Sequence, residues 1–160
     1  MFVALFVVQL IYVRPKATQE ALYWLTFNGT LQIFEICEAM ISLGFASKVV
    51  EYLSWNILCL EAAVTLCTVK YLPWRVRQYC LVAKCYDEIN DVEAAAGTVD
   101  RAIKSINFLL ELESLDPPVP PDVLNVLDTC TQRMKILKFK YDTLNNPALI
   151  KIDEGATIGE

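Results

Sequence analysis

The stretch YCLVAKCYDEINDVEAAAGTVDRA, residues 79–102, contains two helical segments in which large and small side chains alternate. In the first segment, the small residue Ala83 stands between the large residues Tyr79 and Tyr86. In the second segment, Ala95 and Ala102 are both small. Packed helices lie about 8–10 Å apart, depending on the side chains at their contact, and small residues allow the close approach. The stretch therefore predicts a pair of closely packed helices.

The spacing of these residues is that of the tetratricopeptide helix pair. The seven positions are filled by Tyr79, Val82, Ala83, Tyr86, Ala95, Val99 and Ala102. A degenerate copy lies 46 residues earlier, at Ile33, Ile36, Cys37, Met40, Val49, Leu53 and Asn56. Asn56 fits poorly because a small residue belongs there, and the offset exceeds the usual period of about 34 residues. We predict an all-α fold of antiparallel helix pairs stacked as a tetratricopeptide-like α-solenoid segment; the alternative is an antiparallel helical bundle without repeats.

Breaks in the helical pattern divide the chain into regions. Gly44 is a natural C-cap residue and Ser47 a natural N-cap residue, so we expect one long helix to end near Leu43 and the next to run from Ser47 to about Leu66. The prolines of SLDPPVPP, residues 114–121, exclude a helix there. The predicted regions are an apolar N-terminal helix at 1–16, a helical-repeat region with two helix pairs at 17–113, a proline-rich connector at 114–121, a C-terminal amphipathic helix at 122–146 and a flexible acidic tail at 147–160.

The predicted C-terminal helix carries an apolar stripe and several basic residues. Asp122 is expected to cap its first turn. Apolar residues recur at steps of four and three, which is typical of a narrow contact with one partner helix. This candidate interface consists of Val123, Leu127, Cys130, Met134, Leu137, Tyr141 and Leu144. The basic residues Arg133, Lys135, Lys138 and Lys140 could bind an acidic surface such as that of tubulin, or form a solvated face.

Residues 1–13, MFVALFVVQLIYV, are apolar apart from Gln9. As a helix they would span roughly 20 Å, which is less than a hydrocarbon core of about 30 Å. Positive charge follows this stretch at Arg14 and Lys16, whereas a signal peptide carries it in front. We expect a helix buried between neighbours in a larger protein, of which this chain is a piece. The alternative is a membrane-associated helical protein anchored by this stretch.

The composition excludes several classes of function. With 14 lysines and arginines against 19 aspartates and glutamates, the formal charge is −5, which disfavours nucleic acid as a partner. The absence of histidine removes histidine-based catalytic pairs and histidine-ligated zinc. The six cysteines lack CxxC pairs and are expected to be buried as small apolar residues. We therefore expect no catalytic residues, no cofactor and no metal. The alternative is a small soluble enzyme that uses the carboxylate pair Glu35 and Glu38.

Two segments carry a resemblance to a known family. They are FEICEAMISLGFASKVVEYLSWNILCLE, residues 34–61, and YLPWRVRQYCLVAKCYDE, residues 71–88. With these segments the chain resembles the helical-repeat region of the cilia- and flagella-associated protein 54 family, very long proteins of the axonemal central apparatus. The resemblance implies a non-enzymatic scaffold of the axoneme, with other axonemal proteins as partners, that is needed for cilium assembly and movement and for sperm flagella. It supplies no catalytic residues.

Overall fold

The structure, a computed structural model, describes residues 22–146. These residues form helices and no strand, which confirms the predicted all-α class. The helices are α3 (Tyr23–Ser42), α4 (Ala46–Ala62), α5 (Leu72–Glu88), α6 (Val92–Ser114) and α7 (Pro121–Asn145), with the short 3₁₀ helices η1 (Val64–Cys67) and η2 (Val69–Tyr71) between α4 and α5. The predicted N-terminal helix at 1–16 and the predicted tail at 147–160 lie outside the described residues.

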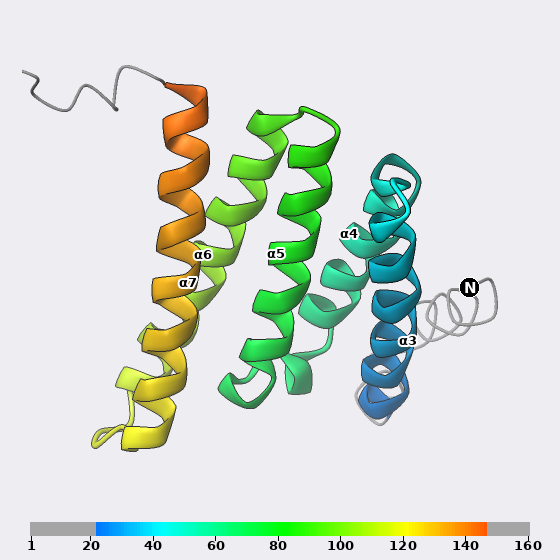
Figure 1. Cartoon of the computed structure of the whole chain (residues 1–160). Helices are drawn as coiled ribbons and strands as arrows, with labels where there is room; N and C mark the ends of the chain where they lie inside the picture. The colour runs from blue at the N-terminus through cyan, green and yellow to red at the C-terminus, as the bar shows by residue number, and fades with distance from the viewer. Residues whose placement is uncertain (1–21, 147–160) are drawn as a thin grey trace, which may run out of the picture.

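Successive helices are antiparallel and stack in chain order (Figure 1). Each helix packs mainly against its neighbours in the chain, α3 on α4, α4 on α5, α5 on α6 and α6 on α7. Helix α5 also contacts α3 and α7, so these three helices form one row, with α4 and α6 behind them in Figure 1. This two-layer stacking is the arrangement expected of helix pairs that follow one another in a solenoid.

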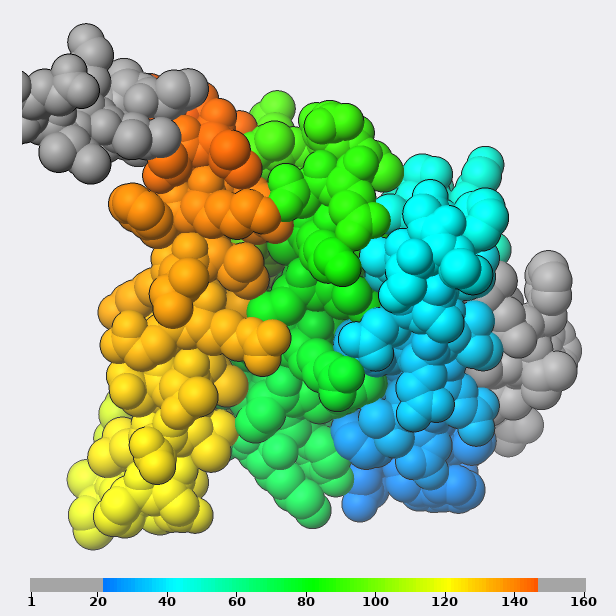
Figure 2. All heavy atoms as spheres, viewed as in Figure 1, coloured from blue at the N-terminus to red at the C-terminus, as the bar shows by residue number. Residues whose placement is uncertain are grey.

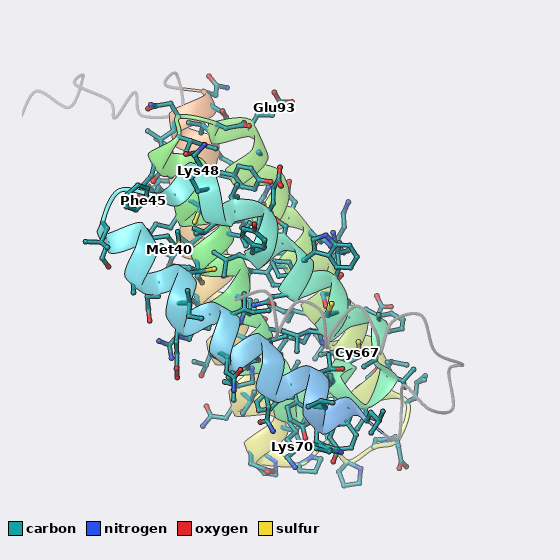
Figure 3. The ribbon with its side chains drawn as sticks, turned by 90° about the vertical axis from the view of Figure 1, so that its right-hand side faces the viewer. Met40, Phe45, Lys48, Cys67, Lys70 and Glu93 are labelled. Atoms are coloured by element: carbon teal, nitrogen blue, oxygen red, sulfur yellow. The ribbon has the colours of Figure 1, made fainter. Side chains whose placement is uncertain are left out.

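The turns inside the two helix pairs share one geometry. After α3, Gly44 has a φ of +83°, and the amide of Phe45 donates to the carbonyl of Met40 at 3.0 Å. After α5, Asn90 has a φ of +61°, and the amide of Asp91 donates to the carbonyl of Tyr86 at 2.8 Å. Both are the six-to-one hydrogen bonds that close a helix around a left-handed residue. In Figure 3, Met40 and Phe45 flank the first turn, and Glu93, beside the second, lies at the same end of the molecule.

The core is continuous along the stack. Its largest fully buried side chains include Phe34 of α3, Tyr79 of α5 and Tyr141 of α7. Helix α5 is central and buries apolar residues toward both neighbours. At the other end from the two turns, aromatic rings join α3 to the start of α5, with ring centroids 4.9 Å apart for Phe34 and Trp74.

Both predicted boundaries of the second helix, α4, are wrong. Helix α4 ends at Ala62 and not near Leu66, because the chain becomes extended at Ala63 and continues as η1 and η2, which bury Leu66 and Val69 in the core. Ser47 lies inside α4, since the turn at Gly44 places the helix start at Ala46.

The predicted cap of the last helix is also wrong. Asp122 does not cap α7, which begins at Pro121 with Pro120 as its cap residue and no side-chain hydrogen bond. Proline fits a first helical turn because the amide that it lacks has no partner there.

Candidate interaction surfaces

The seven residues of the tetratricopeptide-like pattern lie between α5 and α6. Six of them are buried, and Tyr86 is half-buried against the same core. Ala83, Ala95 and Val99 form one cluster with Tyr141 of α7. These positions therefore hold the second helix pair together and also fix α7 on it.

The degenerate copy lies between α3 and α4 at the same relative positions. Five of its residues are buried, Met40 is half-buried, and Ile36 is 39% exposed. Asn56, the poor fit to the pattern, is 1% exposed, and its amide nitrogen donates to the carbonyl of Thr30 at 3.3 Å. A polar side chain is tolerated in this core because it is hydrogen-bonded.

The hydrogen bond of Asn56 belongs to a network across three helices. The Thr30 hydroxyl on α3 donates to the carbonyl of Phe27 at 2.7 Å and accepts from the indole nitrogen of Trp74, on α5, at 3.1 Å. Thr30 is fully buried. The network thus connects α3, α4 and α5 at specific side chains, a connection that no apolar spacing predicts.

A second polar network connects α4, α5 and α6. The Glu61 carboxylate accepts from the hydroxyl of Tyr79 and pairs with Arg101. Burial, followed by the hydrogen bond to Glu61, raises the pKa of Tyr79. Nearby on α5, Arg75 is 3% exposed and donates through Nη2 to Ser105, whereas its Nε and Nη1 have no hydrogen-bond partner within residues 22–146.

The apolar stripe of α7 faces its own chain. Leu127, Cys130, Met134 and Tyr141 are buried, and Val123 and Leu137 pack against the core half-buried. Only the last member of the stripe, Leu144, is half exposed. Helices α5 and α6 thus supply the partner surface for this stripe.

The outward surfaces of α6 and α7 carry other apolar side chains. Ile136 and Phe139 of α7 are 70% and 72% exposed, and Phe108 of α6 is 59% exposed. Ile136 and Phe139 are three residues apart and therefore neighbours on the surface of α7. Adjacent exposed apolar side chains are typical of a site that contacts another protein.

The four basic residues of α7 do not form one patch. Lys138 pairs with Asp100 of α6 at 2.6 Å, and Lys140 pairs with Asp87 of α5. Arg133 and Lys135 are exposed and have no carboxylate partner among residues 22–146. Arg133 lies beside the half-buried thiol of Cys80; burial raises the pKa of this thiol, and the guanidinium opposes that rise.

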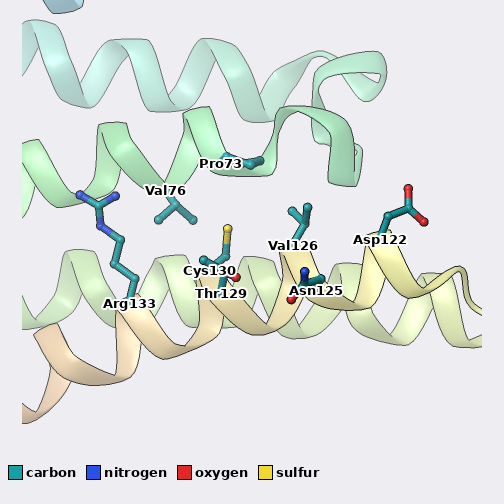
Figure 4. Close-up of a pocket in the computed structure, with 8 residues that line it drawn as sticks. All are labelled: Pro73, Val76, Asp122, Asn125, Val126, Thr129, Cys130 and Arg133. Carbon is teal, nitrogen blue, oxygen red and sulfur yellow. The ribbon is translucent and has the colours of Figure 1, made fainter.

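Hollows open along the face formed by α3, α5 and α7, which Figure 2 shows from the front. The first, here called the apolar hollow, has a volume of about 390 Å³ and lies between α5 and α7 (Figure 4). It is lined by Pro73, Val76, Asp122, Asn125, Val126, Thr129, Cys130 and Arg133. A second hollow, about 430 Å³, extends toward α3, and a third, about 350 Å³, toward Tyr141. Arg133 lines all three, so they meet at its side chain.

The residues of the enzymatic hypothesis lie on the surface. Glu35 and Glu38 are both exposed, and Glu38 pairs with Arg77 at 3.5 Å. Residues 22–146 contain no cluster of acidic residues and cysteines that could hold a metal ion. Over the same residues, no helix is both long and apolar enough to cross a membrane. The apolar stretch at 1–13, on which the membrane alternative rests, lies outside the described residues.

Comparison with known proteins agrees with the resemblance found in the sequence. Residues 3–146 match the family model described as cilia- and flagella-associated protein 54, which is most of the chain. The chain belongs to this family. It is 38% identical over 95 residues to cilia- and flagella-associated protein 54 of Mus musculus, and 37% identical over 95 residues to that of Homo sapiens, 59% of the chain in both cases. Identity to the Chlamydomonas reinhardtii protein is 37% over 105 residues, or 65% of the chain.

The chain spans about 3% of the length of each of these relatives of the cilia- and flagella-associated protein 54 family. The family match includes all helices of the described region, from α3 to α7. The stacked helix pairs are therefore part of what the family model recognises.

Proposed function

We propose that this chain is a non-enzymatic scaffold segment in the axoneme of motile cilia and flagella. Its membership of the cilia- and flagella-associated protein 54 family is the observation that carries the proposal. The role we infer, in the cytoplasm and cytoskeleton of the cilium, is to contribute to cilium assembly and movement and to sperm flagella as part of the central apparatus. The surface positions of Glu35 and Glu38 support a role without catalysis.

Contacts with other axonemal proteins would use exposed helix faces. Phe108, Ile136 and Phe139 supply apolar side chains for such contacts, since the stripe of α7 that packs inward is already buried. A contact between tubulin and all four basic residues of α7 would have to break the ion pairs of Lys138 and Lys140. We therefore favour axonemal proteins other than tubulin as partners.

The proposal is tested by expressing the tagged chain in multiciliated cells and extracting them with detergent, which removes membrane and leaves the axoneme. Retention on the extracted axoneme is the expected result. Phe139→Asp should lower this retention, because it places a charge in an apolar contact, whereas the exposed polar site Gln132→Asp should not.

Two outcomes would contradict the proposal. Complete release of the chain with the detergent fraction would favour the membrane-associated alternative. Release into the soluble fraction before detergent would show that this segment has no binding site on the axoneme.

A further inference from the structure

We propose that the groove between α5 and α7 binds an acidic peptide segment of a partner protein. A carboxylate of the segment pairs with Arg133, and a neighbouring apolar side chain fills the apolar hollow. The inference rests on the proposed scaffold role, because it names the chemistry of one partner contact. The occupant is recognised by charge and by shape at adjacent points of the same groove.

The first argument is the charge balance along this face. The cations that line the hollows beside Arg133 each have a carboxylate partner: Arg77 pairs with Glu38, Lys84 with Glu88 and Lys140 with Asp87. Arg133 has none among the described residues and has the thiol of Cys80 as its neighbour. A guanidinium has five N–H donors, so Arg133 can contact the Cys80 thiol and still form a two-pronged pair with an incoming carboxylate.

The second argument is the position of Arg133. Its side chain extends from α7 toward α5 at one end of the apolar hollow, and Asp122 lies at the opposite end (Figure 4). A ligand in the groove therefore meets positive charge at one end and negative charge at the other. This polarity places the acidic side chain of the segment at the Arg133 end and disfavours the reversed orientation.

The third argument is the character of the hollow between these two charges. Pro73 and Val126 supply its accessible apolar surface, and Thr129 lies at its exposed rim. The other apolar lining residues, Val76 and Cys130, are buried. A volume of about 390 Å³ is at the lower end of the range for sites that bind small molecules, roughly 300–1,000 Å³, and admits an apolar side chain. An acidic residue alone would leave this surface in water, so the segment pairs an acidic residue with an apolar one.

The test uses the full chain and synthetic peptides. A fluorescein-labelled peptide of Leu-Glu-Glu repeats is the probe, and a Leu-Gln-Gln peptide of the same length is its uncharged control. Fluorescence anisotropy at low salt should show that the Leu-Glu-Glu peptide binds about tenfold more tightly, and that added salt reduces the difference. Equal affinity for the two peptides would overturn the proposal.

A pair of charge reversals locates the binding site. Arg133→Glu should weaken binding of the Leu-Glu-Glu peptide about tenfold or more. Lys135→Glu is the matched control, because Lys135 is also an exposed cation of α7 with no carboxylate partner in the described part of the chain, but lines none of the three hollows. Equal losses in both variants would show general attraction to cations and would overturn the proposal.

A second pair tests the apolar hollow without a change of charge. Thr129→Trp places a large side chain at the rim of the hollow and should weaken binding several-fold. Gln132→Trp introduces the same side chain at an exposed site of α7 that lines none of the three hollows, and should leave binding unchanged. Unchanged binding in Thr129→Trp would overturn the assigned site.

The remaining outcomes separate the groove from the scaffold role. A chain that binds the acidic peptide through Arg133 but is washed from extracted axonemes contradicts the scaffold role and supports the groove. A chain that stays on axonemes but does not bind the peptide contradicts the groove alone. A dimer in solution that Arg133→Glu dissociates would place a second copy of the chain in the groove and would overturn the proposed occupant.

Discussion

Gly44 and Asn90 occupy the same position in two turns 46 residues apart, both with a left-handed backbone. The offset is the one that relates the two sets of packing residues in α3–α4 and α5–α6. Turn geometry and helix packing therefore repeat together. The repeat is longer than the usual period of about 34 residues, and the linker that contains η1 and η2, between the two helix pairs, supplies part of the extra length.

Gly44 should be sensitive to a side chain, and Gly97 of α6 should not. Gly44→Ala is expected to cost about 1–2 kcal/mol, because a φ of +83° is strained for residues with a Cβ atom. Gly97→Ala should increase stability by up to about 1 kcal/mol, since alanine favours a helix interior. At neither site would the added Cβ meet an atom within 4 Å. Urea unfolding measures the free energy of unfolding of both variants. If it changes in the same direction in the two, the assigned backbone conformation of Gly44 is contradicted.

Ala83 should tolerate enlargement less well than Ala94. Ala83 is fully buried between α5, α6 and α7, so Ala83→Leu is expected to cost about 1–3 kcal/mol through overpacking. Ala94 is half-buried at the start of α6, and Ala94→Leu should change stability by about 0.5 kcal/mol or less. Thermal unfolding followed by circular dichroism compares the two. Equal melting temperatures would count against the predicted role of Ala83 at the helix contact.

Apolar spacing was sufficient to predict the helices and much of the core, because a helix with one buried face repeats its apolar residues every three or four positions. The same spacing continues through Leu66 and Val69, which are buried although they lie in 3₁₀ turns. Apolar spacing indicates which residues are buried but does not distinguish an α-helix from a 3₁₀ helix. It therefore does not locate the end of α4 at Ala62. The predicted cap at Asp122 was wrong because α7 already begins at Pro121, and no side chain caps its first turn.

The interaction surfaces were harder to predict from the sequence than the helices. The stripe of α7 predicted a contact, but spacing alone does not tell whether the partner helix belongs to the same chain. Arg133 and Lys138 are both basic residues of α7, yet one lines the hollows and the other pairs with Asp100 on α6. Which residues meet depends on packing between helices far apart in sequence, and this information is absent from the periodicity of a single helix.

The buried hydroxyl of Thr30 should matter more than that of Thr98. Thr30→Val removes the acceptor of the Trp74 indole and is expected to cost about 1–3 kcal/mol. Thr98→Val is the same chemical change at a half-buried residue of α6. The Thr98 hydroxyl donates to the carbonyl of Ala94 in its own helix, so its loss should cost about 0.5 kcal/mol or less. Urea unfolding compares the variants. If Thr30→Val is equally costly in a Trp74→Phe background, the hydrogen bond between them does not contribute to stability.

Alkaline pH should destabilise the fold through its buried thiols. Burial raises the pKa of Cys37 to about 11 and those of Cys59 and Cys85 to about 12, from an ordinary value of 9.0. Above pH 9.0 the unfolded chain loses these protons while the folded chain keeps them, so the folded state binds more protons and the free energy of unfolding falls as pH rises. The loss approaches about 1.4 kcal/mol per pH unit for each thiol. The effect begins as the pH approaches 9.0 and vanishes well below it, where the thiols are protonated in both states.

Cys59→Ala tests this explanation directly. The variant lacks one titrating thiol, so its free energy of unfolding should fall less steeply between pH 9.0 and 11 than that of the unmodified chain. Val50→Ala, another truncation of a buried side chain on α4, is the control: it should lower stability by the same amount at every pH, because valine does not titrate. Parallel curves for Cys59→Ala and the unmodified chain over this range would show that Cys59 keeps no more protons in the folded state than in the unfolded one.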